Sequence, residues 1–233
     1  FHNADIYPKH YQKIRAITYR KTTKEVTIHE RLKPLDKKYG LNKFVFKMVS
    51  EFPGGKWMRQ HIIAPILYKG NPVEWRNYEA SYDILELEPK SRNKSTYLLQ
   101  EYFVPVDKFE IFYQLMSDIL KKNKVNVLNI SIRHSLKDPG SIMAWAKNEV
   151  FAFVIYYKQD TKKEDCDKVK KWTQQLIDAS LSCGGTYYLP YQIYATKTQF
   201  KNAYPDSERF FQLKKQLDST NKFRNKLWDE YFE

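Results

Sequence analysis

The order of hydrophobic patterns between residues 96 and 189 limits most strongly which folds this chain can adopt. Residues 96–104 have a strand-like composition, and after Pro105 apolar residues recur three and four positions apart, as in an amphipathic helix. Two further strand patterns follow at 125–133 and 150–157. A second helical pattern and a short strand complete the stretch, so we expect the order strand, helix, strand, strand, helix, strand.

The second helical pattern places Val169, Trp172 and Leu176 on one stripe. It is predicted to end at Gly184-Gly185, and a short strand over 186–189 follows. This order is typical of a ferredoxin-like βαββαβ unit, an antiparallel sheet with helices on one face. We therefore expect an α+β fold with N-terminal strands and helices before this unit and a C-terminal helical segment after it.

The segments outside this unit show weaker patterns. Residues 11–32 alternate as two strands joined by a polar turn, and residues 41–51 and 56–68 are predicted to be helices separated by a Pro-Gly-Gly breaker. A polar stretch at 88–94 is the best candidate for a linker or exposed loop. From about residue 196 the pattern predicts two or three short helices.

The strand predicted at 125–133 has one apolar and one largely polar face. By alternation, Leu128, Ile130 and Ile132 point one way, and Val127, Asn129, Ser131 and Arg133 point the other. If helices cover the first face, the second presents an amide, a hydroxyl and a guanidinium in one line. That face is either solvated or part of a polar site that another domain completes. The pattern alone favours solvation, because antiparallel sheets often have one wet face.

The chain contains only 7 glycines, and none forms a G-x-G-x-x-G or Walker pattern. Loops that hold nucleotide phosphates need several neighbouring glycines, so we expect no phosphate-binding part of a nucleotide site here. The 2 cysteines fall in one predicted helix, too far apart to be bridged. Because these cysteines and the 5 scattered histidines lack ligand spacing, we expect no metal.

The formal charge of +13 is concentrated near the N-terminus, where residues 1–50 carry 12 Lys and Arg against 4 Asp and Glu. A basic chain can bind nucleic acid or an anionic membrane surface, or can dock onto an acidic partner. The absence of a nucleic-acid motif favours either a basic surface exposed to solvent or one that docks onto an acidic partner. No stretch approaches the roughly 18 apolar residues of a membrane span, and no signal peptide is visible. A cytoplasmic or membrane-peripheral location is favoured, and the compartment stays open.

Three segments together suggest a family: "LLQEYFVPVDKF" at 98–109, "NVLNISIRHS" at 126–135, and the stretch from "GGTYYLPYQIY" at Gly184 to Phe232. The chain resembles the C-terminal half of FAD-linked oxidoreductases of the vanillyl-alcohol oxidase / p-cresol methylhydroxylase superfamily. The most similar branch contains the aldonolactone, alditol and decaprenyl-phosphoryl-ribose oxidases. In those enzymes an E-Y-x-x-P strand opens the substrate (cap) domain, and a later strand carries an arginine that faces the flavin. The resemblance is good over 95–233 and loose over 1–94.

The resemblance implies the substrate-binding half of an FAD-dependent enzyme that oxidises a CH–OH group by hydride transfer to the flavin. The substrate would be a sugar, sugar lactone or polyol. Residues 1–94 would be a basic N-terminal extension, 95–190 the ferredoxin-like substrate domain, and 191–233 a helical return that packs on an FAD domain. Most of the FAD site would belong to that upstream domain, so this chain alone is expected to be inactive. We expect no DNA partner, and residues 1–50 are candidates for contact with a membrane or other anionic surface.

The resemblance also assigns residues. Arg133 matches the arginine near the reactive face of the flavin, where a permanent cation can bind the substrate hydroxyl or stabilise negative charge on its oxygen. Tyr191 is the second catalytic candidate, because a tyrosine beside a cation can act as acid or base. Asn129, Ser131 and Glu101 are the candidates for binding substrate, although Ser131 stands where related enzymes often have a glutamate.

Contacts to the cofactor are assigned to Gly185, Tyr188, Tyr191 and Asn225. After the G-G segment, related enzymes often place an aromatic residue or histidine and then a lysine that supports negative charge on the reduced flavin. Tyr188 and Tyr191 occupy these positions here, and neither supplies a positive charge.

The alternative is a basic ferredoxin-like module that binds nucleic acid or protein without catalysis. Such modules stack bases on aromatic side chains of the open sheet face. The polar face of the strand at 125–133 has no aromatic residue, which counts against this alternative.

Overall fold

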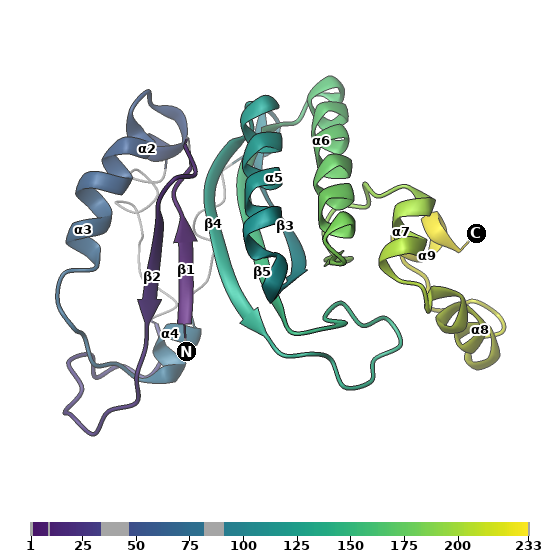
Figure 1. Cartoon of the computed structure of the whole chain (residues 1–233), viewed down its shortest axis with the longest axis horizontal. Coiled ribbons are helices and arrows are strands. Elements are labelled where there is room, and N and C mark those ends of the chain that lie inside the picture. Colours follow the sequence, from purple (N-terminus) through teal and green to yellow (C-terminus); the bar gives the residue numbers. More distant parts are fainter. Residues whose placement is uncertain (1, 9, 34–46, 82–90, 233) are drawn as a thin grey trace.

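A six-stranded antiparallel sheet runs through the molecule, and two long helices cover one of its faces (Figure 1). The computed structural model describes residues 2–8, 10–33, 47–81 and 91–232. The strands are β1 (His2–Ile6), β2 (Ile14–Thr18), β3 (Ser95–Pro105), β4 (Asn126–Ser135), β5 (Val150–Asp160) and β6 (Thr186–Tyr187), in the spatial order β2-β1-β4-β5-β3-β6. The expected α+β class is confirmed.

The helices occur as predicted along most of the chain. They are α2 (Gly55–Met58), the π-helical η1 (Arg59–Ile63), α3 (Ala64–Leu67), α4 (Arg76–Ala80), the 3-10 turn η3 (Val106–Lys108), α5 (Phe109–Lys122), α6 (Lys163–Ser182), α7 (Lys197–Ala203), α8 (Ser207–Leu217) and α9 (Lys226–Tyr231). The succession β3, α5, β4, β5, α6, β6 confirms the order of elements expected from the sequence.

The core lies between the sheet and the helices α5 and α6. Phe153 of β5 packs edge-to-face on Phe112 of α5, with ring centroids 4.9 Å apart. Tyr157 packs in the same way on Trp172 of α6 at 5.0 Å. The apolar stripe of each helix therefore faces the sheet, as an amphipathic pattern predicts.

The end of α6 explains the glycine pair that follows it. Gly184 has a φ of +73°, a left-handed conformation that glycine adopts at little cost. A Cβ on Gly185 would lie 2.3 Å from the carbonyl oxygen of Phe103, so this position packs directly against β3. Both glycines are thus accounted for by the turn from helix to strand.

The N-terminal region differs from expectation. Residues 11–32 contain one strand, β2, and not two, and its partner is β1, which the sequence analysis missed. The backbone N–H groups of Thr27 and Ile28 donate to the Val73 carbonyl outside the sheet. β1 pairs with β4 on its other side, so a contact between residues far apart in sequence outweighs the local alternation.

A bulge in β4 interrupts the predicted alternation of the two faces. Val127 pairs with Tyr157, whereas Asn129 pairs with Tyr156, so Leu128 is an extra residue. Val127 consequently belongs to the core beneath the helices and not to the polar face. From Asn129 onward the predicted alternation holds.

Several predictions concern the flanking segments. Residues 47–51 and 55–67 are helical on either side of the expected breaker, and residues 41–46 lie outside the described part. Of the predicted linker, 88–90 also lie outside it, and 91–94 are irregular. Three short helices, α7 to α9, end the chain as expected. The division into three domains stays a prediction, and β1 and β2 extend the same sheet as the later strands.

None of the helices in the described ranges is both long enough and apolar enough to cross a membrane.

Candidate functional site

The sheet face opposite α5 and α6, called the open face below, carries a row of polar residues from four strands. Cross-strand register partners place Arg15, Asp5, Ser131, Val154 and Glu101 side by side. Register partners in antiparallel strands share a face. The row therefore brings a guanidinium, two carboxyl groups and a hydroxyl onto one surface.

The middle of this row is a hydrogen-bonded cluster around Asp5. The Asp5 carboxylate, only 8% exposed, accepts hydrogen bonds from Asn129 Nδ2 and Ser131 Oγ, each at 3.2 Å. Asn129 Nδ2 also donates to Ser131 Oγ at 2.9 Å. Arg59 of η1 donates to Asn129 Oδ1 at 2.9 Å and to the Leu128 carbonyl. Asn129 and Ser131 are thus brought together as expected, and other protein groups occupy their hydrogen-bonding atoms.

Asp5 and Arg59 were not among the site residues predicted from the sequence. For Asp5 a weak signal existed, because a carboxylate stands between Ala4 and Ile6, two apolar residues at strand spacing. For Arg59 no local signal distinguishes it from the other basic residues of the chain.

A second group lies at the β3 end of the row. The Glu101 carboxyl is half-buried, and burial raises its pKa, while the charge of Arg133 acts in the opposite direction. Burial, together with Glu101 and Tyr188, raises the pKa of Tyr191 to about 12, and the charge of Arg133 acts in the opposite direction. The rings of Tyr188 and Tyr191 meet edge-to-face at 4.9 Å. The structure therefore places Glu101, Arg133, Tyr188 and Tyr191, all expected from the sequence, within electrostatic range of one another.

Two backbone and charge features complete this group. The Tyr188 N–H donates to the Glu101 carbonyl at 2.9 Å, which fixes the chain beyond β6 against β3. The Arg133 side chain is exposed and forms no hydrogen bond or ion pair with the described residues. Its cation is therefore available to a ligand on this face.

Gly185 and Asn225 have structural roles in this chain. The Gly185 N–H donates to the Ser180 carbonyl at 2.8 Å, as part of the end of α6. Asn225 Oδ1 accepts the Trp228 N–H at 2.9 Å and so caps α9. α9 lies among the C-terminal helices beyond α6 (Figure 1), and a contact of Asn225 with the cofactor stays a prediction.

The loop between β4 and β5 covers another part of the open face. Ala146 packs with Phe103 and Ala152, and the Trp145 ring packs at a tilt of 34° on Phe103, with ring centroids 4.2 Å apart. Thr186 Oγ1 donates to the Trp145 carbonyl at 2.6 Å. This loop therefore closes the face beside Arg133 with a fixed aromatic contact.

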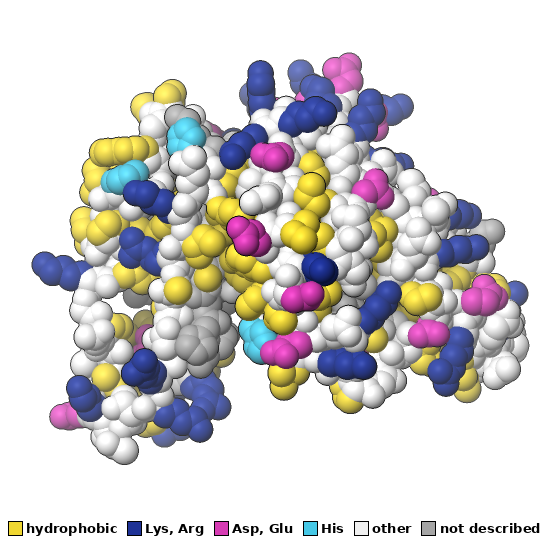
Figure 2. All heavy atoms as spheres, viewed as in Figure 1, with side chains coloured by type: hydrophobic (Ala, Val, Ile, Leu, Met, Phe, Trp, Pro, Cys, Tyr) yellow, Lys and Arg dark blue, Asp and Glu magenta, His cyan; other side chains and the backbone are white. Residues whose placement is uncertain are grey.

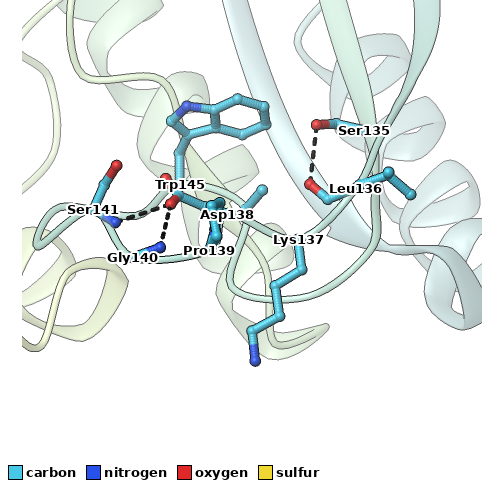
Figure 3. A pocket seen from close by; sticks show the side chains of 9 residues that line it. Ser135, Leu136, Lys137, Asp138, Pro139, Gly140, Ser141 and Trp145 are labelled. Atoms are coloured by element: carbon cyan, nitrogen blue, oxygen red, sulfur yellow. Dashed lines mark hydrogen bonds between the residues drawn. The ribbon is translucent and has the colours of Figure 1, made fainter.

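The same loop contains a pocket of about 660 Å³ (Figure 3). Its wall is formed by residues 135–141 with Trp145 and Ala146. Asp138 Oδ1 accepts the N–H groups of Gly140 and Ser141, both at 2.9 Å, which lowers the pKa of Asp138. The polar groups of the loop thus bind one another, and the pocket shares no residue with the Glu101 group.

Tyr97 and Tyr156 form an aromatic pair elsewhere on the open face, with ring centroids 5.9 Å apart. Lys158, the register partner of Tyr97, forms a 2.6 Å ion pair with Glu51.

Among the described residues, no group of three or more His, Cys, Asp or Glu side chains is arranged to hold a metal ion. Cys166 and Cys183 are free thiols at the two ends of α6.

No family model matches the chain, and no curated protein matches it significantly.

Proposed function

We propose that this chain is the substrate-binding half of an FAD-dependent oxidoreductase that oxidises a CH–OH group of a sugar, a sugar lactone or a polyol. The observation that carries the proposal is the group formed by Glu101, Arg133 and Tyr191 on the open face. It joins a carboxyl group of raised pKa, an exposed permanent cation and a phenol in one place. Perturbed titratable groups of opposite kinds are typical of sites that move protons.

The residues of the open face suit a flavin as neighbour. FAD, when bound, supplies the hydride acceptor for oxidation of the substrate carbon. Tyr188 and Tyr191 offer aromatic contacts to a planar ring, and Arg133 offers a cation to its electron-rich atoms. In this proposal the phosphate-binding loops belong to an upstream domain, because this chain has only 7 glycines.

Each residue of the group has a distinct task in this proposal. Glu101 accepts the proton of the substrate hydroxyl, because a carboxylate of raised pKa is a stronger base than a solvated one. Arg133 stabilises negative charge on the substrate oxygen through its guanidinium. Tyr191, with a pKa of about 12, is a phenol at neutral pH and donates a hydrogen bond that orients the substrate.

The Asp5 cluster supports this arrangement from the side. Asn129 and Ser131 border the site, and their bonds to Asp5 hold β1 against β4. They therefore fix the wall of the site on which the substrate lies.

The test uses this chain expressed together with the segment encoded upstream of it. An absorption band near ~450 nm in the purified protein supports the proposal, and a folded, intact protein without flavin contradicts it. In the flavin-containing protein, Arg133→Ala is expected to slow flavin reduction by sugars or polyols by about 10²-fold to 10³-fold, with FAD content unchanged. Arg133→Lys should recover part of the rate, because it restores charge without the guanidinium geometry.

Arg76→Ala is the matched control, since Arg76 is an exposed arginine of α4 outside the site. It should leave both rate and FAD content unchanged. Equal loss of FAD and rate in Arg133→Ala, or an equally slow Arg76→Ala, would contradict the role of Arg133. Tight binding of nucleic acid with a steep salt dependence would instead support the alternative, for which the Tyr97–Tyr156 pair offers a stacking surface.

A further inference from the structure

The continuous helical stretch α2–η1–α3 turns four large apolar side chains away from the protein. Trp57, Ile62, Ile66 and Leu67 are between 46% and 73% exposed. A helix packed on a core normally turns such residues inward. Here only Gly55 and Ala64 of the stretch are buried.

The inward side of this stretch carries the buried Ala64 and the half-buried Met58 and Ile63, and polar contacts join it to the sheet. Arg59 reaches the Asn129 side chain and the Leu128 carbonyl. Just before the stretch, the Ser50 carbonyl accepts a hydrogen bond from Asn126 Nδ2 at 3.2 Å. The segment is thus held to the sheet by hydrogen bonds and presents its hydrophobic side chains outward, which indicates an apolar partner outside the chain.

Basic residues surround the exposed apolar surface. Figure 2 shows hydrophobic side chains gathered over α2 and α3, with Lys and Arg side chains among them. Besides Arg59, which contacts the sheet, residues 47–70 contain Lys47, Lys56 and Lys69. Their one acidic residue is Glu51, whose carboxylate is paired with Lys158. The whole chain has a formal charge of +13. The partner is therefore expected to combine apolar and anionic groups.

A lipid surface with anionic headgroups combines these two properties. Trp57 and Tyr68, both exposed, are of the residue types enriched where membranes meet water. The stretch of 13 residues from Gly55 to Leu67 is about 20 Å long, too short to cross a hydrocarbon core of about 30 Å. Such a helix lies in the plane of the interface. A second copy of this chain fits less well, because a symmetric contact would oppose two basic surfaces.

We propose that α2, η1 and α3 dock this protein onto an anionic lipid surface, with Trp57, Ile62, Ile66 and Leu67 inserted among the lipid headgroups. The contact joins hydrophobic insertion to attraction by the neighbouring lysines. It is independent of the flavin chemistry proposed above and specifies the surface by which the protein is membrane-peripheral.

The test is co-sedimentation of the 233-residue chain, and of the full-length gene product, with lipid vesicles. Vesicles of phosphatidylcholine with about 30 mol % phosphatidylserine should bind both proteins, and pure phosphatidylcholine should bind them much less. Added salt should weaken binding, since it screens the lysines. The triple variant Trp57→Ser, Ile66→Ser, Leu67→Ser should lower the partition coefficient at least about tenfold.

The control variant is Leu217→Ser with Phe223→Ser, because these side chains are also highly exposed, at 80% and 81%, and lie in the C-terminal segment. It should bind vesicles as the parent protein does. Circular dichroism is used to check that both variants are folded. The flavin content of the full-length variants is measured in the same samples.

Three results would overturn the proposal. They are absence of phosphatidylserine-dependent binding by the full-length protein, equal binding by the triple variant, and a dimer in solution that the triple variant abolishes. The last result would identify a second copy as the occupant of this surface. None of them alters the flavin spectrum, so failure here is distinguishable from failure of the proposed enzymatic function.

Discussion

The two faces of the sheet differ in whether their polar side chains are hydrogen-bonded, as two neighbouring residues of β3 show. On the helix-covered face, Gln100 Nε2 donates to Thr173 Oγ1 at 2.7 Å and to the Tyr157 hydroxyl at 3.0 Å, and the Tyr102 hydroxyl donates to Gln100 Oε1. On the open face, the Glu101 carboxylate forms no hydrogen bond with the described residues. Burial raises its pKa, and the positive charge of Arg133 lowers it.

The difference lies in what remains available for chemistry. Polar groups inside the core are costly unless they are hydrogen-bonded, so the Gln100 network is closed. A half-buried carboxyl without such partners can exchange a proton with a ligand or bind it directly. The helix-covered face therefore provides stability, and the open face provides the candidate site.

The largest expected effect comes from the helix-covered face. Phe112→Ala removes a fully buried ring packed on Phe153 and should lower the free energy of unfolding by about 3–5 kcal/mol. Glu101→Ala on the open face should change it by no more than about 1 kcal/mol. Urea denaturation of both variants measures the difference, and a smaller loss for Phe112→Ala than for Glu101→Ala would refute this division of roles.

An intermediate effect is expected for the Asp5 cluster, whose polar groups are hydrogen-bonded to one another as the polar groups of the core are. Asp5→Ala leaves the donors of Asn129 and Ser131 without their acceptor and should cost about 1–3 kcal/mol. Asp5→Asn keeps an acceptor oxygen and should cost less. The control is Asp107→Ala, an exposed carboxylate, which should stay within about 0.5 kcal/mol of the parent. Equal stability of the two alanine variants would show that the Asp5 cluster does not hold β1 in place.

The smallest effect is a gain of stability from Glu101→Gln. Burial raises the folded-state pKa of Glu101, so folding favours the protonated carboxyl. That contribution is complete below the unfolded-state pKa of about 4.3 and is lost as the pH rises through the higher folded-state value. The variant should therefore be more stable than the parent at about pH 7, by no more than about 1 kcal/mol because the site is partly exposed.

Thermal unfolding between about pH 3 and about pH 8 measures this difference, which should vanish at the acidic end. A parent protein that is more stable than Glu101→Gln at neutral pH would mean that the folded protein favours the charged carboxylate. The open face would then resemble the closed face more than the structure indicates.

Local periodicity accounts for most of what was predictable in the fold. The helices α5 and α6 and the strands around them repeat at 3.6 and 2 residues, so their order and their buried stripes follow from short stretches of sequence. The bulge at Leu128 was not predictable in this way, since it is defined only by the pairing of β4 with β5. The same holds for β1, a strand of 5 residues whose partners are β2 and the distant β4.

The candidate site also has a part that was predictable from the sequence and a part that was not. The sequence by itself determined that Glu101 and Arg133 stand on strands, and alternation sets the face that each one uses. Only the tertiary structure decided that Asp5 and Arg59 join Asn129 and Ser131, and that the apolar side of α2–η1–α3 faces outward. The physical reason is that periodicity reflects interactions within a few residues, whereas these contacts join segments about 70 and more than 120 residues apart.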